Sequence, residues 1–445
     1  MSLTRVPSPH AFSHCARTAG GGARVTRRRR TIVAALVASV ILVGCVFGAI
    51  AAVQYAAFAA TFVRADGTVL VFQGERFEFT GANNYYLGHK PESTVVALLD
   101  DADEAGLTVI RTWGFQDYGD TDGAGVAPGD FEGIWYQSWD DTAGAPVVNT
   151  GATGLEKLDF VIAEAAARDI KLVIPFTNNW NAYGGMDQYV QWAGLNEHSA
   201  FYTDERIRSW YKEWVATLLN RTNSITGVQY KDDPTILAWE LANEPSCTGS
   251  GTLADGECDT ATITEWADEM SRHVKSIDRI HLLGVGDEGF FCGDEDTWTL
   301  THEFGASGHG AGFGENCGNG VDTVALASLR NIDVMSMHLY PDHWQTSTDW
   351  GTGWIEKHAE AAAAIGKPVY LGEFGVMDAS TRAETYATWL ATVRDAGVDG
   401  ALFWMLASDQ EDGTPYPDYD GFTVYCPSEA CAVVGNHAAT LVGAR

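Results

Sequence analysis

Two glutamates are the residues of this 445-residue chain best suited to do chemistry together. Glu244 lies at the end of the segment ILAWELANEP (236–245), and Glu373 lies within PVYLGEFGV (368–376). Both segments are short and apolar, which is typical of strands buried in a parallel sheet. When two carboxyl groups face each other across a cleft, one can donate a proton to a leaving oxygen while the other attacks carbon or activates water. This is the chemistry that breaks glycosidic bonds.

Polar and aromatic side chains follow other apolar segments in the same way. They are Arg111, Trp113, Asn178, Trp180, Asn243, His338, Tyr340 and Trp404. In a (β/α)₈ barrel the active-site groups come from the carboxyl ends of several strands. One polar residue after a strand is often a cap or an ion-pair partner, but packing alone does not explain so many at one edge. We therefore predict that these residues join the two glutamates in one site.

The chemistry of the neighbours suggests a role for each. A guanidinium at Arg111 would hold Glu373 ionised, as a nucleophile requires. Tyr340 would donate a hydrogen bond to the same carboxylate, and His338 would set the proton affinity of Glu244. These roles make Glu244 the acid and base, and Glu373 the nucleophile.

Other predicted site residues would bind the substrate. Asn243 is placed to bind a sugar 2-hydroxyl, whose hydrogen bond strengthens in the transition state. Trp404 offers a flat floor for a sugar ring, and Trp113 and Trp180 would extend it unless they belong to the core.

Two further acids compete for these roles. Glu240 lies four residues before Glu244, so strand alternation places both on one side, with Glu240 deeper. We expect Glu240 to be a buried partner of an arginine. Glu288, at the end of the segment 280–289, is a candidate for contact with the substrate.

Eight apolar segments alternate with longer helical patterns, which favours βα units around a parallel sheet. The apolar segments are 76–86, 107–115, 170–179, 236–245, 280–289, 332–341, 368–376 and 399–407. The helical patterns include 155–168, 203–222, 260–277, 353–365 and 380–396. They predict an α/β fold, a (β/α)₈ TIM barrel, with a short hairpin at 61–75 around Asp66-Gly67 closing its bottom. A doubly wound open sheet is the alternative, but no glycine-rich nucleotide motif follows any segment.

The N-terminus differs from the rest in charge and hydropathy. Residues 1–30 are rich in arginine and are predicted to be a basic disordered tail. Residues 31–60 carry no charge and are long enough to cross a bilayer, which favours a transmembrane signal anchor over a cleaved signal peptide. The arginines would stay in the cytoplasm, leaving residues 61–445, one predicted hydrolase domain, at the cell surface or outside the cell.

Charge and cysteine content narrow the classes of partner. Residues 1–60 hold seven basic residues and no acidic one, so the remainder has 21 basic and 59 acidic residues. Such a domain repels nucleic acid and anionic membrane surfaces, and its expected partner is neutral or cationic. Six cysteines outside the N-terminal segment allow the pairings 247–258, 292–317 and 426–431, although sequence alone cannot prove them. We expect a monomer that needs no metal and no organic cofactor.

Several motifs carry a resemblance to a known family. They are GANNYYL (81–87), IRTWGF (110–115), TNNWNAYGGMDQYVQW (177–192), DDPTILAWELANEP (232–245), GDEGFF (286–291), MHLYPDHW (337–344), GEFG (372–375) and LFWML (402–406). Over roughly residues 62–425 the chain resembles glycoside hydrolase family 5, and more narrowly its fungal and plant mannan endo-1,4-β-mannosidases. Asn-Glu-Pro is common to many barrel glycosidases, whereas the stretch around Asn178 is far more specific to mannanases.

The resemblance implies retaining cleavage of internal β-1,4 bonds in mannan, glucomannan or galactomannan. It also implies that Arg111, Asn243, His338, Tyr340 and Trp404 are shared site residues. One departure is Ser246, since many mannanases have an arginine there that helps bind the leaving-group side. Two alternatives remain: a β-1,4-glucanase of the same family, and a surface carbohydrate-binding protein without catalysis, which would not need both glutamates.

Overall fold

The computed structural model describes residues 29, 54, 56–118, 133–292 and 317–442. The chain divides into two compact units, residues 1–59 and 60–445. The predicted tail and nearly all of the predicted membrane segment lie outside the described residues, so both stay predictions. Within the described ranges, no helix is both long enough and apolar enough to cross a membrane.

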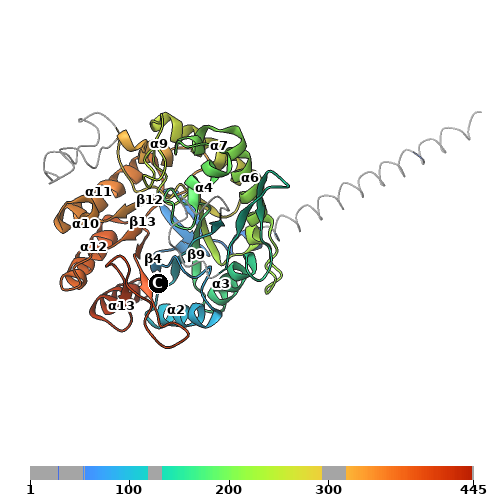
Figure 1. Cartoon of the computed structure of the whole chain (residues 1–445). Helices are drawn as coiled ribbons and strands as arrows, with labels where there is room; N and C mark the ends of the chain where they lie inside the picture. Colours follow the sequence, from blue (N-terminus) through green and yellow to red (C-terminus); the bar gives the residue numbers. More distant parts are fainter. Residues whose placement is uncertain (1–28, 30–53, 55, 119–132, 293–316, 443–445) are drawn as a thin grey trace, which may run out of the picture. The chain divides into compact units, whose positions relative to one another are not determined.

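Eight parallel strands form a barrel at the centre of the larger unit (Figure 1). They are β4 (Phe79–Asn83), β5 (Val109–Arg111), β9 (Lys171–Pro175), β10 (Ile236–Glu240), β11 (Leu282–Gly284), β12 (Met335–Leu339), β13 (Val369–Phe374) and β14 (Gly400–Phe403). Each lies inside one of the eight predicted segments, which confirms the barrel and rejects the open doubly wound sheet. The strands are shorter than predicted because the last residues of each segment already belong to the loop that carries the polar side chains.

The sheet is nearly closed, in the order β11-β10-β9-β5-β4-β14-β13-β12. Two backbone hydrogen bonds bridge the seam between β11 and β12. The N–H of Asp333 donates to the carbonyl of Leu283 at 2.8 Å, and the N–H of His338 donates to the carbonyl of Glu288 at 3.0 Å. The seam therefore brings Glu288 beside His338, a predicted site residue.

Helices surround the strands (Figure 1). The larger ones are α2 (Glu92–Glu104), α3 (Leu155–Ala167), α6 (Glu205–Asn220), α7 (Thr260–Ile277), α11 (Thr348–Ile365), α12 (Arg382–Ala396) and α13 (Glu429–Val442). All five predicted helical patterns are confirmed, and α7 begins at a capping box formed by Asp259 and Thr262. Short helices α4 (Gly185–Trp192), α5 (Ala200–Thr203), α9 (Thr323–Ala327) and α10 (Pro341–Trp344) lie in the loops.

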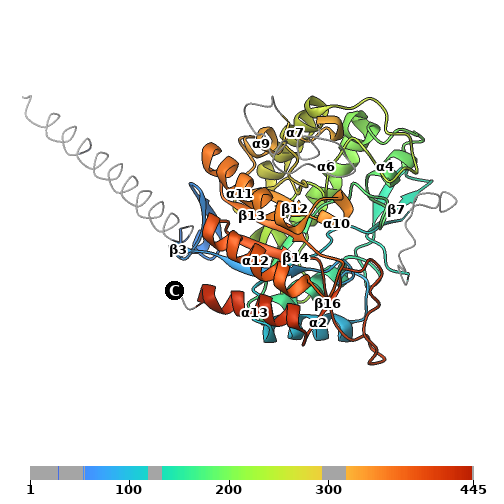
Figure 2. The same cartoon turned by 90° about the vertical axis from the view of Figure 1, so that its left-hand side faces the viewer.

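A small antiparallel sheet closes the amino-terminal end of the barrel. It consists of β1 (Arg64–Asp66), β2 (Val69–Phe72) and β3 (Glu75–Arg76), so the predicted hairpin around Asp66-Gly67 is confirmed. Leu70 and Phe77 pack in one buried cluster with side chains from seven of the eight barrel strands and with Val334, directly before β12. Figure 2 shows β3 at one end of the barrel and β7 (Gln137–Asp140) and β16 (Val424–Tyr425) at the other.

Additional short strands lie in the loops at the carboxyl end. β6 (Asp117–Tyr118) and β8 (Ala145–Val148) pair with β7, and β15 (Leu406–Ala407) pairs with β16. The sequence patterns did not predict them, because strands of two to four residues carry too little periodicity to detect.

Three disulfides confirm the pairings proposed from sequence. Cys247 bonds to Cys258, Cys292 to Cys317, and Cys426 to Cys431. Disulfides of this kind are typical of proteins that fold in the secretory pathway.

The buried end cap gives a prediction about stability. Leu70 is 0% exposed, and its N–H donates to a carboxylate oxygen of Asp399 at 3.1 Å. Leu70→Ala is expected to lower the free energy of unfolding by about 2–5 kcal/mol through the cavity it leaves. Denaturant titration measures this loss. Val69→Ala, at a half-buried neighbour, is the control and should cost clearly less. Because the cap lies opposite the carboxyl end, KM and kcat should not change, and a fall in kcat would contradict this separation.

Candidate active site

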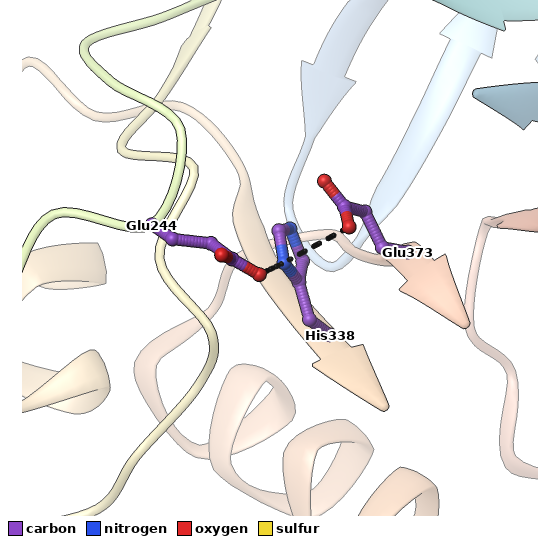
Figure 3. A group of neighbouring side chains, drawn as sticks. All are labelled: Glu244, His338 and Glu373. Atoms are coloured by element: carbon purple, nitrogen blue, oxygen red, sulfur yellow. Dashed lines mark hydrogen bonds and ion pairs between the residues drawn. The ribbon is translucent and has the colours of Figure 1, made fainter. Parts of the chain in front are cut away.

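Glu244 and Glu373 face each other at the carboxyl end of the barrel (Figure 3). Glu373 lies within β13, and Glu244 follows β10 by four residues. One oxygen from each carboxyl group and a ring nitrogen of His338 all lie within 4.8 Å of one another. The structure thus brings the two predicted glutamates together, as their places in the sequence suggested.

The backbone at Glu244 has an unusual conformation. Its φ is +52°, in the left-handed region that residues other than glycine rarely adopt. Its N–H donates to the carbonyl of Gly286 at 2.8 Å, and the N–H of Asn243 donates to the carbonyl of Thr177 at 2.8 Å. Both neighbouring strands therefore hold the residue. Such strain costs on the order of 1–3 kcal/mol and persists where the surroundings enforce it, often at functional sites.

Both oxygens of Glu244 have hydrogen-bond partners. His338 Nδ1 lies 2.6 Å from Oε1, and the indole Nε1 of Trp180 donates to Oε2 at 2.5 Å. Burial raises the pKa of the Glu244 carboxyl, while the bond from Trp180 acts in the opposite direction. Burial also lowers the pKa of His338 to about 4, so its ring is neutral near neutral pH. These conditions favour a carboxyl group that can hold a proton.

Glu373 has a different set of partners. Arg111 Nη1 donates to Oε1 at 2.5 Å, and the hydroxyl of Tyr340 donates to Oε2 at 2.5 Å. Both contacts were predicted. Burial nevertheless raises the pKa of Glu373, as does the nearby charge of Glu244, while Arg111 and Tyr340 act to lower it. The guanidinium thus offsets the cost of burying this charge without reversing it.

Arg111 connects four side chains while being 0% exposed. Besides Glu373, it donates to Glu240 Oε2 at 2.8 Å, Asn83 Oδ1 at 3.2 Å and Asn243 Oδ1 at 2.8 Å. Glu240 is therefore the buried arginine partner predicted from sequence. The two carboxylates raise the pKa of Arg111 although burial alone would lower it.

Asn243 and Asn178 form a bridge between neighbouring strand ends. Asn243 Nδ2 donates to Asn178 Oδ1 at 3.0 Å, while its own oxygen accepts from Arg111. Both amides line the cavity beside Glu244. These two bonds fix the orientation of the Asn243 amide beside Glu244.

Aromatic rings form the walls of a cavity of about 980 Å³. Trp404 stacks with Tyr85 at 5.9 Å between ring centres and lies 5.7 Å from Trp113. Trp404 Nε1 donates to Asp420 Oδ2 at 2.7 Å, which fixes the ring plane. Trp113, Trp180 and Trp404 all line the cavity, so the predicted platform residues lie together there.

Several residues that line this cavity were not predicted. They are Tyr85, His89, Lys90, Ala182, Tyr183, His343, Trp344, Gln410, Tyr416, Tyr419, Asp420 and Phe422. Most belong to loops, where no period of two or 3.6 residues distinguishes a lining residue from a surface one. Two signals were available: five of these residues lie within the motifs that carry the family resemblance, and aromatic residues cluster at 416–425.

Glu288 lies in the same cavity as a third carboxyl group. Burial raises its pKa well above the usual range, and repulsion from Glu244 and Glu373 adds to this shift. The protonated form of this carboxyl group is therefore favoured. This confirms that the residue lines the cleft, as proposed from sequence.

Ser246 is buried in a network behind the cleft. Its N–H lies 3.0 Å from both Asn179 Oδ1 and Tyr202 Oη, and its hydroxyl donates to the carbonyl of Asn319 at 3.3 Å. The side chain is therefore directed into the protein, and Ser246 is not among the described residues that line the cavity.

Glu244, His338 and Glu373 are also the described groups whose positions would suit a metal ion. Their ligand atoms are already engaged with one another or with Trp180, Arg111 and Tyr340. These bonds account for the convergence of the three groups without a metal.

Comparisons with known proteins agree with this geometry. A family model described as GH family 5 beta-mannosidase-like matches residues 146–396. A probable mannan endo-1,4-beta-mannosidase A of Aspergillus niger is 34% identical over 379 residues, covering 84% of this chain and 88% of the relative. The chain belongs to glycoside hydrolase family 5.

Other members of family 5 share both sequence and structure with it. Mannan endo-1,4-beta-mannosidase A of Aspergillus aculeatus is 33% identical and covers 85% of this chain and 90% of its own. The endo-1,4-beta-mannanase of Rhizomucor miehei is 37% identical with a TM-score of 0.76, covering 86% of this chain and 99% of its own. A hyperthermostable mannanase of Thermotoga petrophila is 39% identical with a TM-score of 0.71, covering 82% and 100%.

The buried guanidinium of this family 5 site gives a second prediction. Arg111→Met leaves buried carboxylates without their positive partner, and we expect a loss of about 3–5 kcal/mol in the free energy of unfolding near neutral pH. The pKa of Glu373 rises further in this variant, so the loss becomes smaller as the pH falls and the group is protonated. Denaturant unfolding at several pH values measures it.

The control for this experiment is Arg168→Met. Arg168 forms its ion pairs with Asp100 and Glu164 at the surface, at 2.7 and 2.8 Å. Such pairs contribute roughly 0–1 kcal/mol. Equal losses in the two variants would contradict the special cost of the charges buried around Arg111.

Proposed function

We propose that this family 5 enzyme is a retaining endo-β-1,4-mannanase with Glu244 as acid and base and Glu373 as nucleophile. The single observation that carries the mechanism is the approach of the two carboxyl groups, whose nearest oxygens lie within 4.8 Å. Retaining enzymes have carboxyl groups about 5–5.5 Å apart, whereas inverting enzymes need about 6.5–9.5 Å to admit a water. The close pair supports attack by carboxylate rather than by water.

In the first step a Glu373 oxygen attacks the anomeric carbon. Glu244 gives its proton to the leaving oxygen, and a covalent glycosyl-enzyme forms with release of the acceptor part of the chain. In the second step water attacks the anomeric carbon while Glu244, now ionised, takes its proton; the bond to Glu373 breaks, and the carboxylate of Glu373 is released. The raised pKa of Glu244 suits the first role, and the bond from Trp180 keeps the ionised form accessible for the second.

The remaining site residues bind and orient the sugar. We assign the floor under the reacting ring to Trp404 and the contact with the 2-hydroxyl to Asn243, with Trp113, Trp180 and Asn178 extending the cleft. Arg111, Tyr340 and His338 orient the two carboxyl groups.

The substrate is assigned from the relatives of the chain. Proteins named as mannan endo-1,4-beta-mannosidases match more than four-fifths of the chain, at 84% for the relative from Aspergillus niger. Mannan, glucomannan and galactomannan are therefore the proposed substrates. A β-1,4-glucanase uses the same carboxyl pair and is separated from a mannanase only by assay.

The location and assembly of the enzyme are part of the proposal. Three disulfides support passage through an oxidising compartment. We propose a catalytic domain at residues 61–445, acting as a monomer, outside the cell or at its surface, with residues 31–60 as anchor where they are not cleaved.

The substrate assignment is tested by comparing products from mannan and from cellulose side by side. We expect reducing ends and short oligosaccharides from mannan and far fewer from cellulose. Glu373→Ala should lower turnover by on the order of 10³-fold or more while the fold survives. Glu269→Ala, at a surface ion pair with Lys212, is the matched control and should stay active. Equal release from cellulose would favour the glucanase, and wild-type activity in Glu373→Ala would reject the carboxyl pair.

The roles of the carboxyl groups predict a shift in pH dependence. Trp180 lowers the pKa of Glu244 by donating to its carboxylate, so Trp180→Phe should raise that pKa. Because Glu244 must be protonated in the first step, the basic limb of the kcat/KM profile should move to higher pH. The acid limb, set by Glu373, should stay in place. Trp113→Phe removes an indole from the same cavity and is the control. A fixed basic limb in Trp180→Phe would contradict Glu244 as the acid.

A further inference from the structure

Arg382 begins helix α12 and is only 6% exposed. Its guanidinium donates to four backbone carbonyls, those of Val376 at 2.8 Å, Met377 at 3.2 Å, Gly421 at 2.6 Å and Thr423 at 2.7 Å. The planar fork of an arginine has five N–H donors in fixed directions, which suits it to hold several acceptors at once. A lysine has one nitrogen and cannot span them.

The four carbonyls belong to two loops that are distant in sequence. Val376 and Met377 follow β13, the strand that carries Glu373. Gly421 and Thr423 belong to residues 418–423, a segment that we call the clamp turn. Arg382 therefore links the clamp turn to the loop that follows Glu373.

The clamp turn has its own internal bonds. Asp418 Oδ1 accepts from the N–H of Gly421 at 2.8 Å and from the hydroxyl of Thr423 at 3.0 Å. Gly421 has a φ of +85°, which glycine adopts at little cost. These bonds give the turn a defined shape, and the guanidinium gives that shape a fixed position.

The clamp turn contacts the reaction centre at two points. Asp420 accepts the indole N–H of Trp404 at 2.7 Å and the N–H of Phe422 at 3.0 Å. Phe422 packs edge-on against Tyr340, with 5.3 Å between ring centres. Tyr340 in turn donates to Glu373.

A glycine allows the close packing of Phe422. A Cβ at Gly375, two residues after the nucleophile, would come within 2.6 Å of the Phe422 ring. The backbone at the end of β13 and the clamp turn are therefore in direct contact. A movement of the clamp turn would therefore displace the Trp404 ring and Tyr340, which orients Glu373.

We propose that Arg382 is a positioning residue, which fixes the clamp turn and through it holds Trp404 and Tyr340 in the geometry that the reaction needs. This role rests on the proposed function. Arg382 touches neither the sugar nor the two carboxyl groups, because its contacts are with backbone carbonyls behind the cleft wall.

Two consequences distinguish this role from a general loss of stability. Misplacement of reacting groups by about 1 Å lowers rate by on the order of 10²-fold, so the fall should appear mainly in kcat. The hydroxyl of Tyr340 favours the ionised form of Glu373, so loosening Tyr340 raises the pKa of Glu373. The acid limb of the kcat/KM profile should then move to higher pH, since the nucleophile must be ionised.

The test measures kcat, KM and the pH profile on mannan for Arg382→Met, well below the melting temperature of each variant. We expect kcat to fall by roughly 10- to 100-fold with a smaller change in KM, and the acid limb to move to higher pH. Arg221→Met is the matched control. Arg221 is a largely buried arginine that holds Asp159 at 2.8 Å, away from the cleft. Arg221→Met should lower the melting temperature but leave kcat and the pH profile unchanged.

A second variant keeps the test decisive if Arg382→Met does not fold. Asp418→Ala loosens the same turn from an exposed position, and the same shift of kcat and of the acid limb is expected. Wild-type kcat and pH profile in a folded Arg382→Met would overturn the positioning role. The same result in Asp418→Ala would overturn it if Arg382→Met does not fold. In both cases, mannan cleavage by the wild type would still uphold the proposed function. Absence of cleavage of both mannan and β-glucan by the wild type would instead overturn the proposed function and the positioning role with it.

Discussion

The site depends on one buried positive charge. Arg111 is fully enclosed, and its guanidinium binds Glu240, Glu373, Asn83 and Asn243 together. Each partner lies on or directly after a strand of the barrel, so one side chain ties several strand ends to a common point. A charge in this environment is tolerated only with its partners in place. The requirement to satisfy Arg111 therefore restricts where the nucleophile and the amide beside the acid can lie.

The two carboxyl groups to which we assign catalysis, Glu244 and Glu373, are both buried, but their partners differ. Glu373 receives a guanidinium and a phenol, whereas Glu244 receives an indole and lies beside a histidine that is neutral near neutral pH. The full positive charge lies on the side of Glu373, which makes it the better place for an ionised nucleophile. Both carboxyl groups are buried, but their different partners favour the ionised form at Glu373 and the protonated form at Glu244.

Much of this arrangement was predictable because a barrel converts sequence position into spatial position. A polar residue just after a buried apolar segment must lie at the carboxyl end, so Glu244, Glu373 and Arg111 could be grouped from sequence. Loop residues such as Asp420 and Phe422 could not, since their positions depend on long-range contacts that leave no periodic pattern. The direction of the pKa shift of Glu373 could not be predicted from sequence either. Burial raises this pKa more than Arg111 lowers it, and the extent of burial depends on the final packing. Residues 31–60 were predicted as a membrane segment, and that remains a prediction.

The barrel frame and the loops therefore contribute different things. The frame supplies charge and proton transfer, and those groups come from motifs found throughout the resemblance to family 5. The loops supply most of the residues that line the cavity. The backbone N–H of Ser246 lies near Asn179 and Tyr202, and its hydroxyl donates to the carbonyl of Asn319, so Ser246 is not among the described residues that line the cavity. Trp180, Glu288 and Trp344, by contrast, all line the cavity. Burial and the nearby charges of Glu244 and Glu373 raise the pKa of Glu288, which favours the protonated form of this third carboxyl group beside the other two.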